Sequence, residues 1–177
     1  MTAALALLLA AAQPLVLEGV EAELHVPLQR IWQQGTHAPE AFAQLVRRVY
    51  MRSGRYLAKV EVRTQGGALR VRVAAGSPAR IVSVQFIGNK VLSAEILAQR
   101  MFNRKDSAGA RLMGLGRFAP EALGDDATGV RQAYFDAGYI FATVGAPRVF
   151  VDKDLRGVRL EVPIEEGEPY TVGSLEV

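Results

Sequence analysis

The chain of 177 residues is half hydrophobic, so it can bury one medium core or two small ones and does not have a disordered composition. Its 21 Lys and Arg exceed its 18 Asp and Glu by three, too few to predict nucleic acid or another polyanion as a partner. The absence of cysteine excludes disulfide frameworks and thiolate metal sites.

The first residues, MTAALALLLAAAQP, are small and apolar, and three alanines stand at 10–12, where a signal peptidase requires small residues. We therefore expect a secretory signal peptide over 1–14 and an exported, soluble remainder. The stretch lacks the Lys or Arg that usually precedes such an apolar core, so a buried N-terminal strand or helix is the alternative. No later segment reaches the roughly 18 apolar residues that a membrane helix needs.

Residues 15–79 are expected to form one β-α-α-β-β unit. LVLEGV at 15–20 indicates the first strand, and a first helix is expected to begin near Pro27. The second helix follows Pro39, because apolar residues recur after it at helical spacing. These residues are Phe42, Leu45, Val46, Val49 and Tyr50.

The second helix of this unit meets Gly54, where a left-handed C-terminal cap costs least. After the glycine the apolar period changes from 3.6 to 2 over 57–63, and the alternation returns over 69–73. Gly66-Gly67 between these stretches predicts a tight turn, so the unit should end in a β-hairpin.

Residues 80–170 predict a second copy of the unit. IVSVQFIGN at 81–89 indicates a strand, and Ser93 is placed as the N-cap of the following helix, with Leu92 and Leu97 as a hydrophobic staple. The glycine-rich stretch 103–116 predicts a loop between the helices. The second helix carries Val130, Ala133, Tyr134 and Ala137.

This helix meets Gly138, and one outgoing strand is expected over Tyr139–Val151, followed by a turn over 152–157. The apolar face of the returning strand is Val158, Leu160, Val162 and Ile164.

The two copies share an offset of 84 positions, since Gly138 follows Gly54 at that distance. Residues 171–177 resemble 80–86, which indicates the first strand of a truncated third unit. We therefore predict an α+β fold of tandem β-α-α-β-β domains, each a three-stranded mixed sheet with two helices on one face. The pairs at the shared offset are Tyr50/Tyr134, Gly54/Gly138, Ala58/Ala142 and Val60/Val144.

No pattern in the chain predicts a catalytic, cofactor or metal site. His25 and His37 lack spaced partners for a ligand set, and GLGRFA at 114–119 follows no strand, so it is not a dinucleotide fingerprint. A basic cluster is interpreted as a solvated face, with a polyanion-binding or lipid-headgroup surface as the alternative. It comprises Arg47, Arg48, Arg52, Arg55, Lys59 and Arg63.

These motifs together resemble the POTRA (polypeptide-transport-associated) domains of outer-membrane assembly factors of the BamA and TamA type. The second unit is most similar to the third such domain of BamA, and the first is a divergent copy that lacks the Gly-Asn and Glu-Gly signatures. The residues that carry the resemblance are IVSVQFIGNK at 81–90, Phe118, Glu121, Leu123, Asp126, Val130, Arg131, Tyr134, Gly138, Tyr139, Ile164, Glu166 and Gly167.

The resemblance implies a periplasmic arm of an outer-membrane β-barrel assembly factor, which binds unfolded outer-membrane proteins or accessory assembly lipoproteins. It implies binding by strand addition to an exposed sheet edge, which offers unpaired N–H and C=O groups with little side-chain preference. The expected edge is Ile140, Phe141, Ala142, Thr143 and Val144, with Leu57, Ala58, Lys59 and Val60 as its counterpart.

Alternatives remain open at this point. The arm could be a structural spacer that docks other subunits, or it could belong to a translocation-assembly (TamA-like) or two-partner secretion transporter. The family also has a C-terminal membrane barrel, which needs at least about eight strands. That barrel is missing from these residues, so we expect a fragment of a longer protein on the periplasmic face of a Gram-negative outer membrane.

Overall fold

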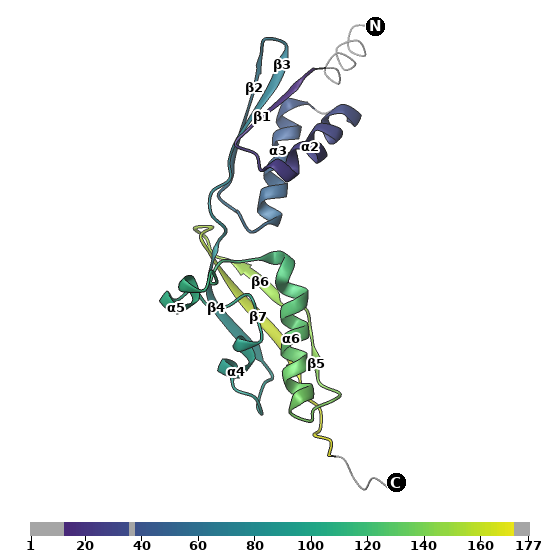
Figure 1. Ribbon diagram of the computed structural model, residues 1–177, viewed down its shortest axis with the longest axis vertical. Coiled ribbons are helices and arrows are strands. Elements are labelled where there is room, and N and C mark those ends of the chain that lie inside the picture. Colours follow the sequence, from purple (N-terminus) through teal and green to yellow (C-terminus); the bar gives the residue numbers. More distant parts are fainter. Residues whose placement is uncertain (1–12, 36–37, 172–177) are drawn as a thin grey trace. The chain divides into compact units, whose positions relative to one another are not determined.

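The computed structural model describes residues 13–35 and 38–171 (Figure 1). Most of the expected signal peptide over 1–14 and of the expected strand over 171–177 lies outside the described residues. The chain divides between Ser77 and Pro78 into two compact units, here called unit 1 and unit 2.

Unit 1 contains a mixed sheet with strand order β1-β3-β2. Strand β1 is parallel to the central β3, and β2 is antiparallel to it. Gly66 and Gly67, both with positive φ, close the β2–β3 hairpin, so the expected turn is confirmed. The elements are β1 (Leu15–Glu18), α2 (Ala22–Gln34), α3 (Pro39–Arg52), β2 (Lys59–Gln65) and β3 (Ala68–Ala74).

The core of unit 1 lies between β3 and its two helices. Alternate residues of β3 are buried, so a single face of this strand packs against α2 and α3. The rings of Trp32 on α2 and Phe42 on α3 lie 5.1 Å apart and join the two helices. The buried set is Leu28, Trp32, Phe42, Val46, Tyr50, Ala58, Leu69, Val71 and Val73.

Helix α2 begins at Ala22, and Pro27 lies inside it, so the expected start near Pro27 is wrong. The apolar periodicity extends back to Leu24, which packs against the core. This burial outweighs the backbone hydrogen bond that a proline removes from a helix interior.

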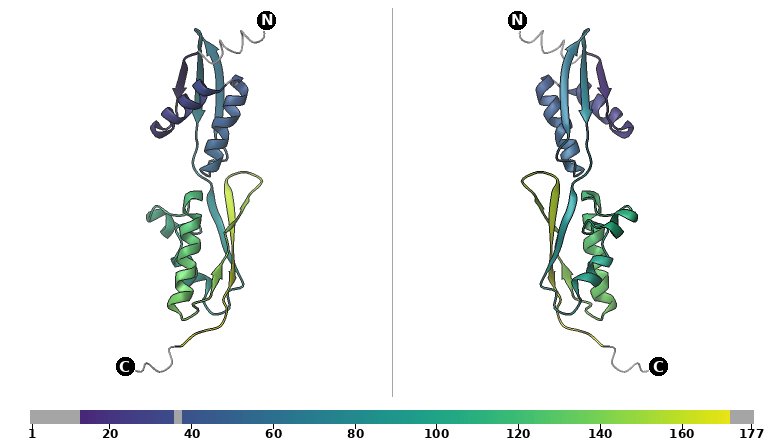
Figure 2. Two further views of the ribbon diagram at one scale, coloured as in Figure 1. Left: turned by 90° about the vertical axis from the view of Figure 1, so that its right-hand side faces the viewer. Right: turned by 90° about the vertical axis from the view of Figure 1, so that its left-hand side faces the viewer.

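Unit 2 is a four-stranded mixed sheet with helices on one face (Figure 2). Strand β4 pairs in parallel with the central β7, while β5 and β6 pair with β7 antiparallel on its other side. The predicted α+β class is confirmed. The elements are β4 (Arg80–Ile87), α4 (Ala94–Gln99), α5 (Ala108–Leu112), a 3-10 turn (Pro120–Ala122), α6 (Leu123–Asp136), β5 (Thr143–Val144), β6 (Arg148–Val151) and β7 (Gly157–Glu165).

The core of unit 2 repeats the pattern of unit 1, with alternate residues of the central strand β7 buried under α4 and α6. The expected N-cap of α4 is confirmed, since the Oγ of Ser93 accepts a hydrogen bond from the backbone N–H of Ile96. The buried set is Leu97, Met101, Val130, Ala133, Tyr134, Ala142, Val162 and Ile164.

The segment between the long helix and the next strand, here called the joint, has the same hydrogen bonds in both units. Gly54 and Gly138 each follow their helix with φ near the left-handed region, at +74° and +87°. The next residues turn once more before the strand begins, so the strands start two residues later in unit 1 and four later in unit 2 than the alternation predicts. In unit 1 the backbone N–H groups of Gly54, Arg55 and Ala58 donate to the carbonyls of Met51, Tyr50 and Arg55, respectively. In unit 2 those of Gly138, Tyr139 and Ala142 donate to the carbonyls of Phe135, Tyr134 and Tyr139.

The single strand expected over Tyr139–Val151 is wrong, because it is broken into β5 and β6. Gly145 donates to the carbonyl of Pro163 on β7, but Pro163 has no N–H to return the bond. The pairing register with β7 shifts by one residue across the break, as in a β-bulge. Pro147 within the gap also lacks a donor, so the ladder resumes only at Arg148.

The expected loop over 103–116 contains a short helix, α5, and hydrogen bonds hold the two ends of the loop together. The side-chain amide of Asn103 pairs with the backbone of Ala119 through two hydrogen bonds, of 2.9 and 2.8 Å. The buried carboxylate of Asp126 on α6 accepts from the Asn103 side chain at 2.7 Å and from the Phe102 backbone. Buried polar groups with every partner present hold such a segment rigid.

Helix α6 contains two glycines for which the same substitution is expected to have opposite effects. A β-carbon at Gly129 would lie 2.3 Å from the carbonyl oxygen of Arg100, whereas one at Gly124 meets nothing within 4 Å. Gly129→Ala should therefore destabilise unit 2 by about 1–3 kcal/mol through overpacking. Gly124→Ala should stabilise it by about 0.5 kcal/mol by restricting the unfolded chain. Thermal denaturation measures the change in stability of each variant. A change of the same sign in both variants would contradict the close contact between Gly129 and the carbonyl of Arg100.

Candidate functional site

The expected site residues of unit 2 divide between the joint and the edge strand. Ile140, Phe141 and Ala142 lie in the turn of the joint, and only Thr143 and Val144 lie in β5. Ile140 and Phe141 are exposed, whereas Ala142 is buried in the core and Val144 packs against it. From Phe141 to Val144 the side chains therefore alternate between solvent and core, as expected for the edge of a half-buried sheet.

The counterpart in unit 1 has the same division. Leu57 and Ala58 lie in the joint, while Lys59 and Val60 begin β2. Leu57 is exposed and Ala58 is buried, matching Phe141 and Ala142. Strand β2 lies at an edge of its sheet, because the strand order is β1-β3-β2.

Hydrogen bonds to β7 show which backbone groups of β5 face outward. Gly145 bonds to Pro163, and antiparallel pairs alternate between bonded and non-bonded positions. Thr143, opposite Glu165, is therefore at a bonded position, and Val144, opposite Ile164, is not. The N–H and C=O of Val144 point away from β7, toward the open side of the sheet.

Strand β6 adds a second open stretch that the sequence analysis did not assign to the site. Asp152 bonds to Gly157, so the alternation places Val149 and Val151 at non-bonded positions of the same ladder. Their N–H and C=O groups also face outward. The signal for this stretch was the alternation Arg148-Val149-Phe150-Val151, which the sequence analysis treated as a continuation of one strand.

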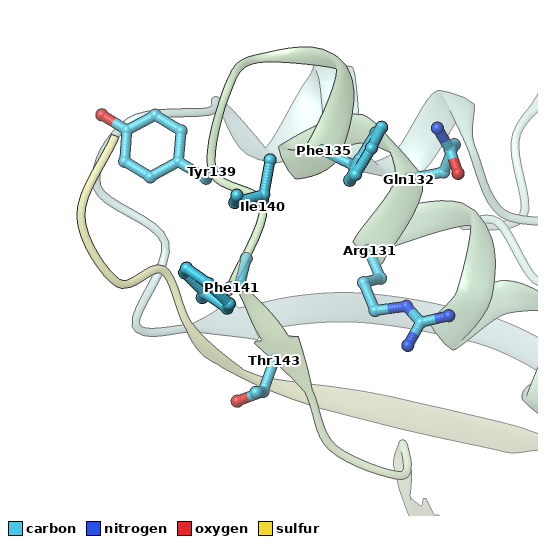
Figure 3. Close-up of a pocket in the computed structure, with 8 residues that line it drawn as sticks. Arg131, Gln132, Phe135, Tyr139, Ile140, Phe141 and Thr143 are labelled. Atoms are coloured by element: carbon cyan, nitrogen blue, oxygen red, sulfur yellow. The ribbon is translucent and has the colours of Figure 1, made fainter. Parts of the chain in front are cut away.

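A groove of about 510 Å³ runs beside this edge, between α6 and the joint (Figure 3). Phe135 on α6 and Phe141 on the joint are 56% and 64% exposed, so the groove presents large apolar surface to solvent. The lining residues are Arg131, Gln132 and Phe135 on the helix side, and Tyr139, Ile140, Phe141, Ala142 and Thr143 on the other side.

The segment that follows β7 packs against the joint of unit 2. The backbone N–H of Tyr170 donates to the carbonyl of Gly138 at 2.9 Å. The ring of Tyr170 meets that of Phe141 edge-on, with centroids 5.1 Å apart. These contacts fix the position of Phe141 at the groove although most of its surface is exposed.

A buried tyrosine ties each joint to a carboxylate. In unit 2 the hydroxyl of Tyr134 donates to Glu166 at 2.8 Å, and Glu166 also accepts from the backbone amides of Lys90 and Val91. Burial alone would raise the pKa of the Glu166 carboxyl, but these hydrogen bonds hold the pKa below its ordinary value. Glu166 therefore stays ionised and joins β4, α6 and the end of β7.

In unit 1 the hydroxyl of Tyr50 donates instead to Glu21, which follows β1. Burial, followed by the hydrogen bond to this carboxylate, raises the pKa of Tyr50 to about 12. Arg55 of the basic cluster lies 3.9 Å from Glu21. The sequence analysis paired the two tyrosines but assigned a partner to neither.

Residues considered for other chemistry are not brought together. His25 bonds to the carbonyl of Val20, and His37 lies outside the described residues. Over 13–35 and 38–171, no group of His, Cys, Asp and Glu could hold a metal ion. Among the helices in those ranges, none combines the length and the apolar character required to cross a bilayer.

Fold and site define a repeat protein of tandem α+β units, each with a free edge on a mixed sheet. The family model named POTRA, described as a surface antigen variable number repeat, matches residues 79–167, which cover nearly all of the described part of unit 2. The chain belongs to the POTRA family, and the resemblance noted in the sequence is confirmed.

Individual proteins are similar to the chain over much of its length. A Treponema pallidum (strain Nichols) protein named "Putative outer membrane protein assembly factor" is 29% identical over 140 residues, which are 75% of this chain and 16% of that protein. The chain thus spans about a sixth of that relative.

Two solved structures are also similar to the chain. BamA POTRA3-5 of Haemophilus influenzae is 20% identical, with a TM-score of 0.43 over 90% of this chain and 67% of that one. The N-terminal domain of Omp85 from Thermosynechococcus elongatus is 22% identical, with a TM-score of 0.44 over 84% of this chain and 60% of that one.

Proposed function

We propose that this chain is part of the periplasmic arm of an outer-membrane protein assembly factor, and that unit 2 binds extended polypeptide segments by strand addition. The binding surface is the outer edge of β5 and β6 together with the groove beside it. The relative named as an outer-membrane assembly factor supports the cellular role.

The observation that carries the proposal is the combination of outward backbone groups with an apolar groove. Val144, Val149 and Val151 offer N–H and C=O groups that an incoming strand can pair with, whatever its sequence. The groove would accept apolar side chains of that strand on one of its faces. Backbone pairing gives tolerance of many sequences, and the groove adds affinity for segments that alternate between apolar and polar residues.

Strands of membrane barrels alternate in this way, with one apolar and one polar face. Unfolded outer-membrane proteins are therefore the clients that we propose for the edge. Unit 1, which we assign as a divergent POTRA domain over 15–79, would offer β2 as a second edge, from Lys59 onward. Accessory assembly lipoproteins are the other occupants that could pair with either edge.

The rival role is a spacer that sets the position of neighbouring domains and binds no client. Titration of the whole chain with a synthetic peptide copied from a membrane barrel strand, followed by backbone amide NMR, separates the two. Strand addition should shift the amides of Val144, Val149 and Val151 more than that of Leu160 on the central β7, whose bonds are already made. Unchanged signals along 140–151 and 57–63 would favour the spacer.

A further inference from the structure

The insertion over 104–117 in unit 2 has no counterpart in unit 1. In unit 1, helix α2 ends at Gln34 and α3 begins at Pro39, and the same arrangement of helices on a mixed sheet forms without an insertion. The extra residues of unit 2 are therefore not a general requirement of this type of unit.

The insertion is a rigid projection, visible on the β4 side of unit 2 (Figure 1). The backbone of Asp106 donates to Ile81 at 2.7 Å, and Ile81 donates to Gly116 at 3.0 Å, so both arms of the insertion are held against β4. Between them, the Oγ of Ser107 accepts from the N–H of Ala110 and caps α5. The last residue of α5, Leu112, and the following Met113, here called the tip, are therefore presented in a fixed position.

The tip exposes two consecutive large apolar side chains. Leu112 is 90% exposed, more than any other large apolar residue in the described part of the chain, and Met113 is 64% exposed. Ala110, one turn earlier, is buried and anchors α5 to the unit. Burial of these two side chains against an apolar partner surface would be favourable.

The apolar tip lies within a basic segment. Residues 104–117 contain one acidic residue, Asp106, and four basic residues, which are Arg104, Lys105, Arg111 and Arg117. The Asp106 carboxylate is already engaged, since it bonds to Arg111 at 2.7 Å and lies 3.7 Å from Arg80. Arg104 and Arg117 bond through their guanidinium groups to backbone carbonyls, which leaves their charges uncompensated.

We propose that this tip docks on an anionic lipid surface. Leu112 and Met113 enter the boundary between headgroups and acyl chains, and the surrounding cations reach the lipid phosphates. Each Lys or Arg near such a surface and each buried apolar side chain adds to binding, so the two features of the tip act together.

A bilayer fits the tip better than an acidic protein does. The two apolar side chains stand on a projection, and a bilayer accepts a projection without a matching pocket. Lys105, an exposed and flexible side chain without an ion pair to any described residue, can adjust to mobile headgroups. The proposal uses residues distinct from the edge and groove, and it stands or falls independently of strand addition.

Sedimentation of the whole chain with vesicles tests the proposal. Vesicles of phosphatidylcholine containing phosphatidylglycerol should bind the chain, and vesicles of phosphatidylcholine alone should bind it weakly. The double variant L112S/M113S should reduce partitioning by about tenfold. Lys105→Glu, at an exposed residue, should reduce it by about tenfold or more, since one attraction is replaced by a repulsion.

Matched controls keep the test specific. Val26→Ser removes an apolar side chain of 61% exposure from unit 1, and Lys153→Glu reverses a charge in the exposed turn before β7. Both should partition like the natural chain. The proposal is overturned if phosphatidylglycerol vesicles do not bind the chain, or if L112S/M113S binds them as well as the Val26 control. It is also overturned if immobilised polyglutamate retains the chain with the same dependence on Leu112 and Met113.

Discussion

Replacing Gly88 by alanine is expected to lower the free energy of unfolding of unit 2 by about 3 kcal/mol or more. Gly88 follows β4 with φ of +100°, a conformation that residues with a side chain rarely adopt. A β-carbon there would lie 2.2 Å from the carbonyl oxygen of Ile164. This oxygen belongs to the central strand, so it cannot move without disturbing the sheet. Amide hydrogen exchange at Leu160 and Val162 measures the loss in unit 2 alone.

Gly114→Ala is the matched control, because Gly114 also has a positive φ, +72°, but a β-carbon there meets nothing within 4 Å. It should cost about 1 kcal/mol, the penalty of the left-handed conformation itself. If Gly88→Ala cost no more than this control, the close approach to β7 would not be the reason for the glycine.

Val144→Pro is expected to weaken binding of a barrel-strand peptide to the chain by about tenfold or more, because the ring removes the outward N–H and occupies the space of the incoming strand. The preceding Thr143 is already extended, as a residue before proline requires. An edge strand tolerates the substitution where a central strand would not. Fluorescence anisotropy of a labelled peptide gives the affinity.

Val144→Ala is the control for this experiment, since it removes similar packing from the core and keeps the N–H. It should bind the peptide within about threefold of the natural chain, if backbone pairing supplies the affinity. Equal losses in the proline and alanine variants would mean that packing of the valine side chain, and not the free edge, determines binding.

Local patterns predicted the features that neighbouring residues determine. The change of period at Gly54 and Gly138 located both joints, because a helix cap needs only the residues around it. Ser93 was identified as an N-cap for the same reason. The alternation from Val158 to Ile164 predicted the buried face of β7, since a central strand shows its burial in its own sequence.

Features that depend on a distant partner were missed. The break between β5 and β6 is caused partly by Pro163, which lies on another strand and leaves Gly145 with a one-sided bond. The groove depends on Phe135, an exposed residue on α6 that the helical pattern alone does not mark as functional. The outward groups of β6 could be assigned only after the pairing register was known.

Unit 1 lacks the Gly-Asn pair that follows the first strand of unit 2, yet Gly19 has the backbone role of Gly88. Its φ is +70°, and a β-carbon there would lie 2.3 Å from the carbonyl of Val73, the counterpart of the contact between Gly88 and Ile164. The fold therefore requires only the glycine of the Gly-Asn pair. The side-chain amide of Asn89 has a separate, local role and donates to the carbonyl of Leu92.

The tyrosine at each joint shows how the two copies have diverged. Tyr50 and Tyr134 occupy the same place and both need an acceptor for a buried hydroxyl, but Glu21 follows the first strand of its unit and Glu166 follows the last. Both units meet the same chemical requirement, but from different positions in the chain. A residue-by-residue alignment of the two units therefore does not pair Glu166 with Glu21. A substitution of Glu166 should be compared with a substitution of Glu21, because these two carboxylates accept from the equivalent tyrosines.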